Sequence, residues 1–321
     1  MKLIIIFVAV WITLVRSTVV QRDRVLVKPP GKSNVTLDVI IDKPKDDESG
    51  EVIVMLPSSQ RGSDEDFDPV AERIALAGYR VLRPQPRGIG QSRGSMENLT
   101  LHTLADDVAA VIQEFAASGH QAVVVGHAFG HYVARVTDLD YPELVRGVVL
   151  VAASRFGGDS KLSAKLDNIA DGTLPHEERL ALLYDAFFAP GNDATVWLTG
   201  WYPSLRNFYR NASRTPPNTA WWPVSNAPIL DLQAADDPWR PRNTSQELRD
   251  ALGADKVTIK TIEHASHALL PEQPKQVTDA IVAWIKALPS SAVSYTNKDS
   301  SGMIVLCTFV FVYIPQLLFL I

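Results

Sequence analysis

The chain has 321 residues, of which 46% are hydrophobic and 21% charged, and its formal net charge at pH 7 is −5. This composition is typical of a globular protein with one large domain or two small ones. No basic patch indicates nucleic acid as a partner, and no polybasic segment indicates anionic lipid. The sequence shows neither metal-ligand spacing nor a dinucleotide glycine pattern, so we expect no metal and no cofactor.

The first segment of the chain is apolar. Lys2 is followed by an apolar run over residues 3–15 that only Thr13 interrupts. This run is short for a bilayer span but has the length of a signal-peptide core, and Val15-Arg16-Ser17 offers small residues for cleavage. We therefore expect residues 1–17 to be a signal peptide. The alternative is an uncleaved membrane anchor.

Strands and helices alternate through the first half of the remaining chain. β-Branched and alternating apolar runs predict strands, whereas helical spacing of apolar residues, as at Leu104, Val108 and Ile112, predicts helices. The expected strands are 24–28, 35–41, 51–56, 79–82, 122–125 and 145–151, and the expected helices are 67–77, 103–117 and 129–137. The first two strands should pair at a sheet edge and be followed by a loop at 42–50. The alternation after them predicts a parallel sheet with right-handed crossovers.

The alternation stops at residues 154–226, which are helical in pattern and rich in aromatic residues. It resumes with strands expected at 228–233 and 257–262 and a closing helix at 276–288. An insertion after the sixth strand is where a helical cap would lie. Trp201, Trp221 and Trp222 could line a pocket for an apolar substrate, or could form the core of the cap, as aromatic side chains usually do.

The last segment of the chain is also apolar. Small residues at 290–292 precede a polar spacer at 293–302 and an apolar tail at 303–321, and no basic residue follows the tail. This order is typical of a GPI-attachment signal, whereas a single-span anchor usually carries basic residues on its cytoplasmic side. We expect residues 292–321 to be such a signal or a membrane anchor, which would hold a domain of residues 18–291 at the extracellular face of the plasma membrane.

Two further features agree with secretion. The chain has four sequons for N-linked glycans, which are possible sites if it enters the secretory pathway. The asparagines are Asn34, Asn98, Asn211 and Asn243. The single cysteine, Cys307, lies in the expected tail, so the mature domain would have no disulfide and would depend on its hydrophobic core.

The motif at residues 126–130 is the most informative in the chain. Gly126-His127-Ala128-Phe129-Gly130 follows a predicted strand and opens a predicted helix. A strand, a G-x-nucleophile-x-G turn and a helix together form a nucleophile elbow, in which the central side chain enters the active site. Here the central residue is alanine, whose methyl group cannot form a seryl ester.

The chain resembles the α/β-hydrolase family, in its capped branch of epoxide hydrolases and esterases, from about residue 35 to 288. The motifs that carry the resemblance are residues 79–84 with 87–92, the elbow, Ala234-Ala235-Asp236-Asp237-Pro238, and residues 264–272. The order of elbow, acid and histidine is that of this family. The resemblance implies a mostly parallel eight-stranded sheet flanked by helices, with a helical cap at about 154–226.

The resemblance also implies roles for single residues. His267 would be the general base and Asp237 the acid that orients it, with His264 and Asp236 as neighbouring candidates. The oxyanion hole would use the backbone N–H groups of Phe129 and of the turn at Ser59. The family usually has His-Gly before that turn, whereas this chain has Pro57-Ser58-Ser59. The missing glycine puts the second donor in doubt.

Three functions are compatible with alanine at the elbow. The first is a pseudoenzyme that binds a small apolar molecule or a partner in the retained pocket. The second is an enzyme that uses the His–Asp dyad without serine, because such a dyad can abstract a proton or activate water. The third is an esterase or epoxide-hydrolase-like enzyme whose natural serine was substituted. The sequence identifies neither the ligand nor the oligomeric state.

Overall fold

The computed structural model describes residues 20–45, 51–64, 66–117 and 119–289. The expected signal peptide at 1–17 and the expected anchor at 292–321, including Cys307, lie outside these residues. Across the described ranges, no helix is both long and apolar enough to cross a membrane.

Eight strands form one sheet in the order β1-β2-β4-β3-β5-β6-β7-β8. β1 pairs with β2 and β2 with β4 in antiparallel fashion, and the remaining neighbours are parallel. The strands are β1 (Val20–Val27), β2 (Leu37–Pro44), β3 (Val52–Leu56), β4 (Arg80–Pro84), β5 (Ala122–His127), β6 (Val145–Val151), β7 (Ile229–Ala234) and β8 (Val257–Ile262). The predicted mostly parallel sheet of eight strands, with an antiparallel pair at its edge, is confirmed.

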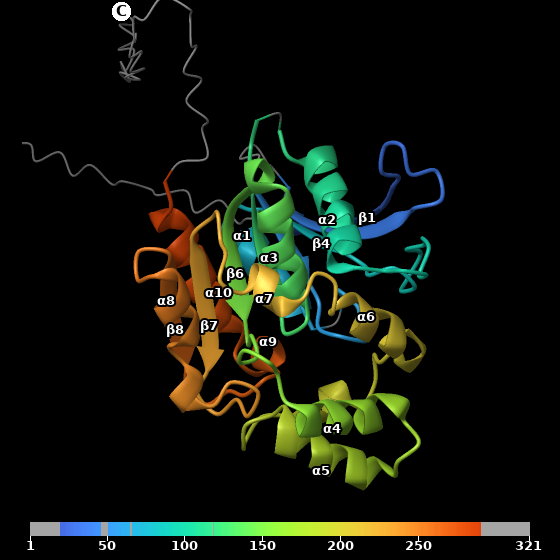
Figure 1. Ribbon diagram of the computed structural model, residues 1–321, viewed down its shortest axis with the longest axis vertical. Coiled ribbons are helices and arrows are strands. Elements are labelled where there is room, and N and C mark those ends of the chain that lie inside the picture. Colours follow the sequence, from blue (N-terminus) through green and yellow to red (C-terminus); the bar gives the residue numbers. More distant parts are fainter. Residues whose placement is uncertain (1–19, 46–50, 65, 118, 290–321) are drawn as a thin grey trace, which may run out of the picture. The chain divides into compact units, whose positions relative to one another are not determined.

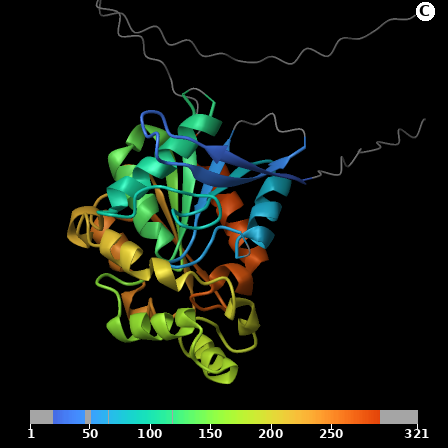
Figure 2. The same cartoon turned by 90° about the vertical axis from the view of Figure 1, so that its right-hand side faces the viewer.

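Helices cover both faces of the sheet (Figures 1 and 2). One face carries α2 (Leu101–Phe115) and α3 (Gly130–Asp140), and the other carries α1 (Asp68–Leu76) and α10 (Pro274–Ala287). Between them these helices bury both faces of the parallel strands, which explains why β3 and β5 are apolar at nearly every position. The remaining short elements of the sheet domain are α8 (Glu247–Leu252), α9 (Leu269–Glu272) and the 3-10 turns Pro142–Leu144 and Arg242–Thr244.

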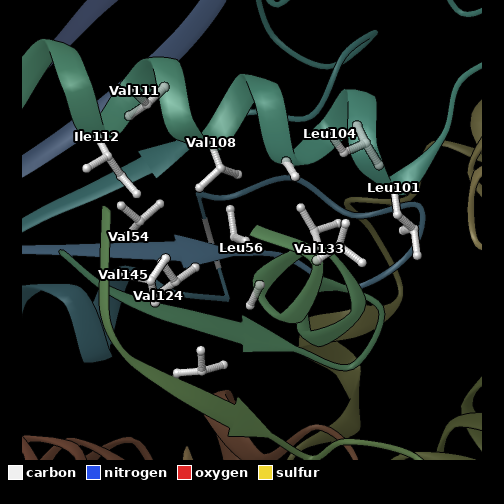
Figure 3. Close-up of a cluster of buried hydrophobic side chains, with 14 of the residues drawn as sticks. Val54, Leu56, Leu101, Leu104, Val108, Val111, Ile112, Val124, Val133 and Val145 are labelled. Atoms are coloured by element: carbon white, nitrogen blue, oxygen red, sulfur yellow. The ribbon is translucent and has the colours of Figure 1, made fainter. Parts of the chain in front are cut away.

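The side chains of each strand alternate between two cores. Val54 and Val124 belong to the core under α2 and α3, whereas Ile53 and Val123 belong to the core under α1 and α10. Figure 3 shows the first core, where the apolar stripe of α2 points toward β3 and β5. The threonine at the start of α2, Thr100, accepts a hydrogen bond from the Thr103 N–H at 3.1 Å and so caps the helix.

Some predicted boundaries were wrong. β1 begins at Val20 rather than at residue 24, and α3 ends at Asp140 rather than at residue 137. The end of β2 has a clear physical reason. Residues 42–44 were expected to start a loop, but β2 continues to Pro44. Asp42 is fully buried in the strand, where its carboxylate pairs with Arg83 of β4 at 2.8 Å and with Arg22 at 2.6 Å. An apolar pattern cannot reveal a strand that continues through a buried ion pair, because the partner comes from another strand.

The insertion between β6 and β7 is helical. It contains α4 (Ser160–Asp171), α5 (His176–Ala186), α6 (Arg206–Ala212), α7 (Asn218–Trp221) and the 3-10 turns Ala194–Trp197 and Pro203–Leu205. In both views α4 and α5 lie beyond the end of the sheet toward which the parallel strands point (Figures 1 and 2). Phe187 and Trp197 of the insertion share a third hydrophobic core with Trp239, which follows β7. The insertion therefore packs on the loops where an active site of this fold would form.

Candidate active site

The turn at Ala128 has the geometry of a nucleophile elbow. Ala128 adopts φ +46°, a left-handed conformation that a residue with a Cβ rarely adopts. A Cβ on Gly126 would lie 2.4 Å from the carbonyl oxygen of Gly130, and one on Gly130 would lie 2.2 Å from the carbonyl oxygen of Leu56. The two glycines are therefore required by close backbone packing, and the strained turn is kept although its central side chain is a methyl group.

The loops after β7 and β8 bring Asp237 and His267 together. His267 Nδ1 lies 3.0 Å from Asp237 Oδ2, and Asp237 Oδ1 accepts a hydrogen bond from the Trp239 N–H at 2.8 Å. Both residues are buried, whereas the two alternative candidates, Asp236 and His264, are exposed. Because Asp237 engages Nδ1, the ring nitrogen left to meet a ligand is Nε2.

Aromatic residues fix the plane of the His267 ring. Trp239 stacks on it at a centroid distance of 4.9 Å and an interplanar angle of 24°, and Phe187 of the insertion meets it at 5.6 Å. His127 Nε2 donates a hydrogen bond to the His267 carbonyl oxygen at 2.8 Å. Burial and the neighbouring His267 lower the pKa of His127 to about 4, so His127 is a neutral donor that anchors this loop.

Ala128 and His267 line the same cavity, which has a volume of about 150 Å³. Its lining contains both aromatic side chains and polar groups, the polar ones on α4 and at or just after α6. The aromatic residues are Phe129, Tyr132, Phe187, Tyr209 and Trp239, and the polar ones are Ser163, Asp167, Arg206, Arg210 and Ser213. The cavity can thus hold a small molecule with an apolar part near Ala128 and a polar part near the insertion.

The three tryptophans expected in the pocket do not line this cavity. Trp201 packs on the Arg61 guanidinium, whose carbon lies 4.7 Å from the ring centroid. Trp221 and Trp222 pack around the buried Arg135, which donates hydrogen bonds to both of their carbonyl oxygens. Their rings stabilise buried cations that hold the insertion on the sheet domain, and a one-dimensional pattern cannot separate this role from pocket lining.

The expected oxyanion turn also lies at the cavity. Ser58, Ser59 and Phe129 all line it, so both segments expected to supply the backbone donors border the same cavity as Ala128. Gln60, next in the chain, adopts φ +62° and is 3% exposed. The turn therefore contains a left-handed residue although it lacks the glycine that is usual in the family.

Glu272 connects the His267 loop to the insertion. Its carboxylate accepts hydrogen bonds from the Ser266 N–H and the Ala189 N–H, both at 2.6 Å, and from Asn192 Nδ2 at 2.9 Å. Burial, opposed by these hydrogen bonds, raises the pKa of Glu272 to about 7. The residue before His267 is thereby tied to the insertion through one carboxylate.

A family model described as the alpha/beta hydrolase family matches residues 53–280. The chain belongs to the α/β-hydrolase family. The match covers the strands from β3 to β8, the insertion and the loops that carry Ala128, Asp237 and His267.

Relatives of this α/β-hydrolase-family protein include a protein of Variovorax paradoxus that bears the name of a carbamate hydrolase, RutD. It is 28% identical over 229 residues, which are 67% of this chain and 84% of the relative. The structure of Rv0554 from Mycobacterium tuberculosis superimposes with a TM-score of 0.66 at 22% identity, over 83% of this chain and all of that one. The structure of a thermophilic esterase from Thermogutta terrifontis superimposes with a TM-score of 0.65 at 18% identity, over 83% of this chain and 98% of that one. At these identities the two structures share the fold.

Sequence reasoning missed several side chains at the site of this α/β-hydrolase-family protein. Trp239 directly follows the Asp-Pro step, and that adjacency could have drawn attention to it. Arg206 and Arg210 are four residues apart, which places them on one face of a helix, and both line the cavity. Tyr132 lies on α3, four residues after Ala128, and this local spacing could have indicated it, whereas only the packing of the insertion brings Phe187 to the cavity. In the described residues no three His, Cys, Asp or Glu side chains are grouped as metal ligands.

Proposed function

We propose that this protein binds a small ester or a related carbonyl compound in the cavity at Ala128 and does not hydrolyse it through a seryl ester. The observation that carries the proposal is the intact elbow with a methyl group at its centre. Ala128 has the backbone strain of a nucleophile position and lines the same cavity as His267. The elbow geometry is kept although its nucleophile is missing. This supports binding of the kind of ligand that a hydrolase recognises, without acyl transfer to the protein.

The test compares the parent domain, residues 18–291, with its Ala128→Ser variant. We expect the parent to be inactive on short-chain aryl esters and the serine variant to turn them over, because His267 and Asp237 are already hydrogen-bonded. Carbamate esters should be included among the compounds tested, because the Variovorax paradoxus relative bears the name of a carbamate hydrolase. Adding His267→Ala to the serine variant should remove the gained activity, typically by more than about a thousandfold.

The contrary outcome is also specific. Robust ester turnover by the parent that is lost on His267→Ala would show that the site is catalytic without serine, and the binding-only proposal would be abandoned.

A second function is favoured by the 3.0 Å contact between His267 and Asp237. A buried, oriented dyad can remove a proton from a bound carbonyl compound without any seryl intermediate. Exchange of α-protons of a ketone in D₂O, followed by NMR, would detect this activity. We expect Asp237→Asn to reduce the exchange at least about tenfold if the dyad acts as a base. No exchange above the buffer rate in the parent would exclude this function for that ketone class.

We also propose that the domain is displayed on the cell surface by a glycosylphosphatidylinositol anchor. The support is the sequence pattern of residues 290–321 together with the apolar run at 3–15. Phosphatidylinositol-specific phospholipase C should release the processed domain from intact cells that express the full-length chain. Retention on the cells after treatment, with a known anchored protein released in parallel, would favour a membrane span instead.

A further inference from the structure

A second, larger hollow of about 680 Å³ lies between α4 and the segment of α6 and α7. It shares five lining residues with the cavity at Ala128, so the two spaces are neighbours. These residues are Tyr132, Ser163, Asp167, Arg210 and Ser213. A ligand that occupies both spaces would pass these side chains.

The hollow contains more positive than negative side chains. It is lined by three arginines, Arg155, Arg210 and Arg214, and by two aspartates, Asp159 and Asp167. Arg155 pairs with Asp159 at 3.4 Å, and Arg210 pairs with Asp167 at 2.6 Å. Both aspartates are thus already engaged, and one positive charge is left over.

The unbalanced charge is that of Arg214. Its side chain is exposed, and no ion pair of Arg214 occurs within the described part of the chain. Arg206, which lines the inner cavity, lies 3.7 Å from the Asp167 carboxylate that Arg210 already binds. The inner cavity and the hollow together hold four arginines against two aspartates, so an anion can bind there without displacing an existing pair.

The lining of the hollow also contains aromatic side chains. Phe156 is 43% exposed and lies 5.4 Å from Trp222, and Trp221 lines the hollow beside it. An exposed phenyl ring next to a surplus of cationic side chains favours a ligand that has both an apolar body and an acidic group. The glycines at 157 and 158 keep the loop beside Phe156 free of side chains, and a Cβ at either would meet no atom within 4 Å.

We propose that the hollow recognises the acidic end of the ligand, and that this ligand is a small amphiphilic carboxylate. Its carboxylate pairs with Arg214 beside Arg210, its apolar chain lies along Phe156 and Trp222, and its far end reaches Ala128 and His267. This inference rests on the proposed function, because it names the class of ligand for the same site. The small volume of the neighbouring cavity at Ala128, about 150 Å³, favours a small molecule over a macromolecular partner.

The experiment uses two matched probes, 6-phenylhexanoate and its neutral amide, 6-phenylhexanamide. Their dissociation constants for the glycosidase-treated domain, residues 18–291, are measured by calorimetry at pH 7.5. We expect the carboxylate to bind more tightly than the amide. Arg214→Glu should weaken the carboxylate by about threefold to tenfold and leave the amide unchanged, as expected for reversing one exposed ion pair. Raising the salt concentration should weaken only the carboxylate.

Arg249→Glu is the matched control. Arg249 is exposed on α8 and lines neither space, and its substitution by glutamate changes the net charge by the same amount. If the two probes bind the parent equally, or if Arg214→Glu and Arg249→Glu have the same effect, the inference is wrong while the proposed binding function stands. If neither probe binds the parent, the inference is wrong, and the aryl-ester test of the Ala128→Ser variant decides the proposed function separately.

Discussion

At the scale of single residues, the elbow is the most constrained part of the molecule. The strain at Ala128 persists because Gly126 and Gly130 allow the turn to press against its own helix and against β3. A backbone conformation of this kind costs free energy and is kept only when its surroundings determine it. The turn therefore retains the backbone geometry of a nucleophile elbow, although Ala128 has no hydroxyl group.

Gly130→Ala should be among the most destabilising single changes in the chain. The new methyl group would lie 2.2 Å from the Leu56 carbonyl oxygen, so the backbone must shift, which lowers the free energy of unfolding by about 3 kcal/mol. Gly31→Ala is the control, because Gly31 has φ +73° but a Cβ at this position would meet no atom within 4 Å. Gly31→Ala should lower the free energy of unfolding by only about 1 kcal/mol. The free energies of unfolding are measured with urea. Equal decreases for Gly130→Ala and Gly31→Ala would contradict this account of the elbow.

His127 should make the folded state sensitive to acid. Its pKa is lowered from 6.5 to about 4, so the unfolded chain takes up a proton before the folded chain does. The stability that His127 contributes is therefore complete above about pH 6.5 and is lost as the pH falls toward 4, by about 3 kcal/mol in all. The measurement is the difference in unfolding free energy between the parent and His127→Gln over this range. A difference that does not change with pH would show that His127 is not held neutral.

At the scale of elements, the position of the insertion depends on a few polar links. Glu272 of α9 accepts hydrogen bonds from the insertion and from the loop of His267, and Arg61 lies between Trp197 and Trp201 while paired with Asp66 at 2.5 Å. These links join segments that are far apart in the sequence. They hold the insertion over the cavity at the carboxyl ends of the strands.

Glu272 should have the opposite pH dependence to His127. Its pKa is raised from 4.5 to about 7, so the folded chain binds the proton more tightly than the unfolded chain. Its contribution to stability is complete below about pH 4.5 and is lost as the pH rises through 7, by about 3 kcal/mol at most. We expect the unfolding free energy of the parent, relative to Glu272→Gln, to decrease from pH 4.5 to 7. An increase over that range would mean that the hydrogen bonds outweigh burial.

Most elements were predictable because their pattern is local. The stripe of Leu104, Val108 and Ile112 predicted α2 to within two residues at each end, and β6 and β8 have the predicted bounds. The end of β2 was not predictable, because Asp42 is buried by its pairing with Arg83 of another strand. The position of Phe187 at the pocket was not predictable for the same reason, since a segment distant from Ala128 brings it there.

At the scale of the whole molecule, the four sequon asparagines are compatible with glycosylation. Asn34, Asn98, Asn211 and Asn243 are all exposed, so a glycan at any of them would meet solvent. Expression in a secretory host should give a chain whose mass falls on treatment with peptide N-glycosidase F, and each Asn→Gln variant should remove one glycan. A secreted chain of unmodified mass would contradict the prediction.

The sequence by itself determined the order of strands and helices, the place of the insertion and the identity of the elbow, because these depend on local periodicity and on glycines that only a tight turn requires. The resemblance to the α/β-hydrolase family also singled out Asp237 and His267, in the motifs that follow the last two strands. Only the tertiary structure decided that these two side chains meet at 3.0 Å, and that Trp201, Trp221 and Trp222 pack on arginines and do not line the inner cavity at Ala128. Distances between residues far apart in the chain depend on how the insertion packs, and one-dimensional patterns do not encode that packing.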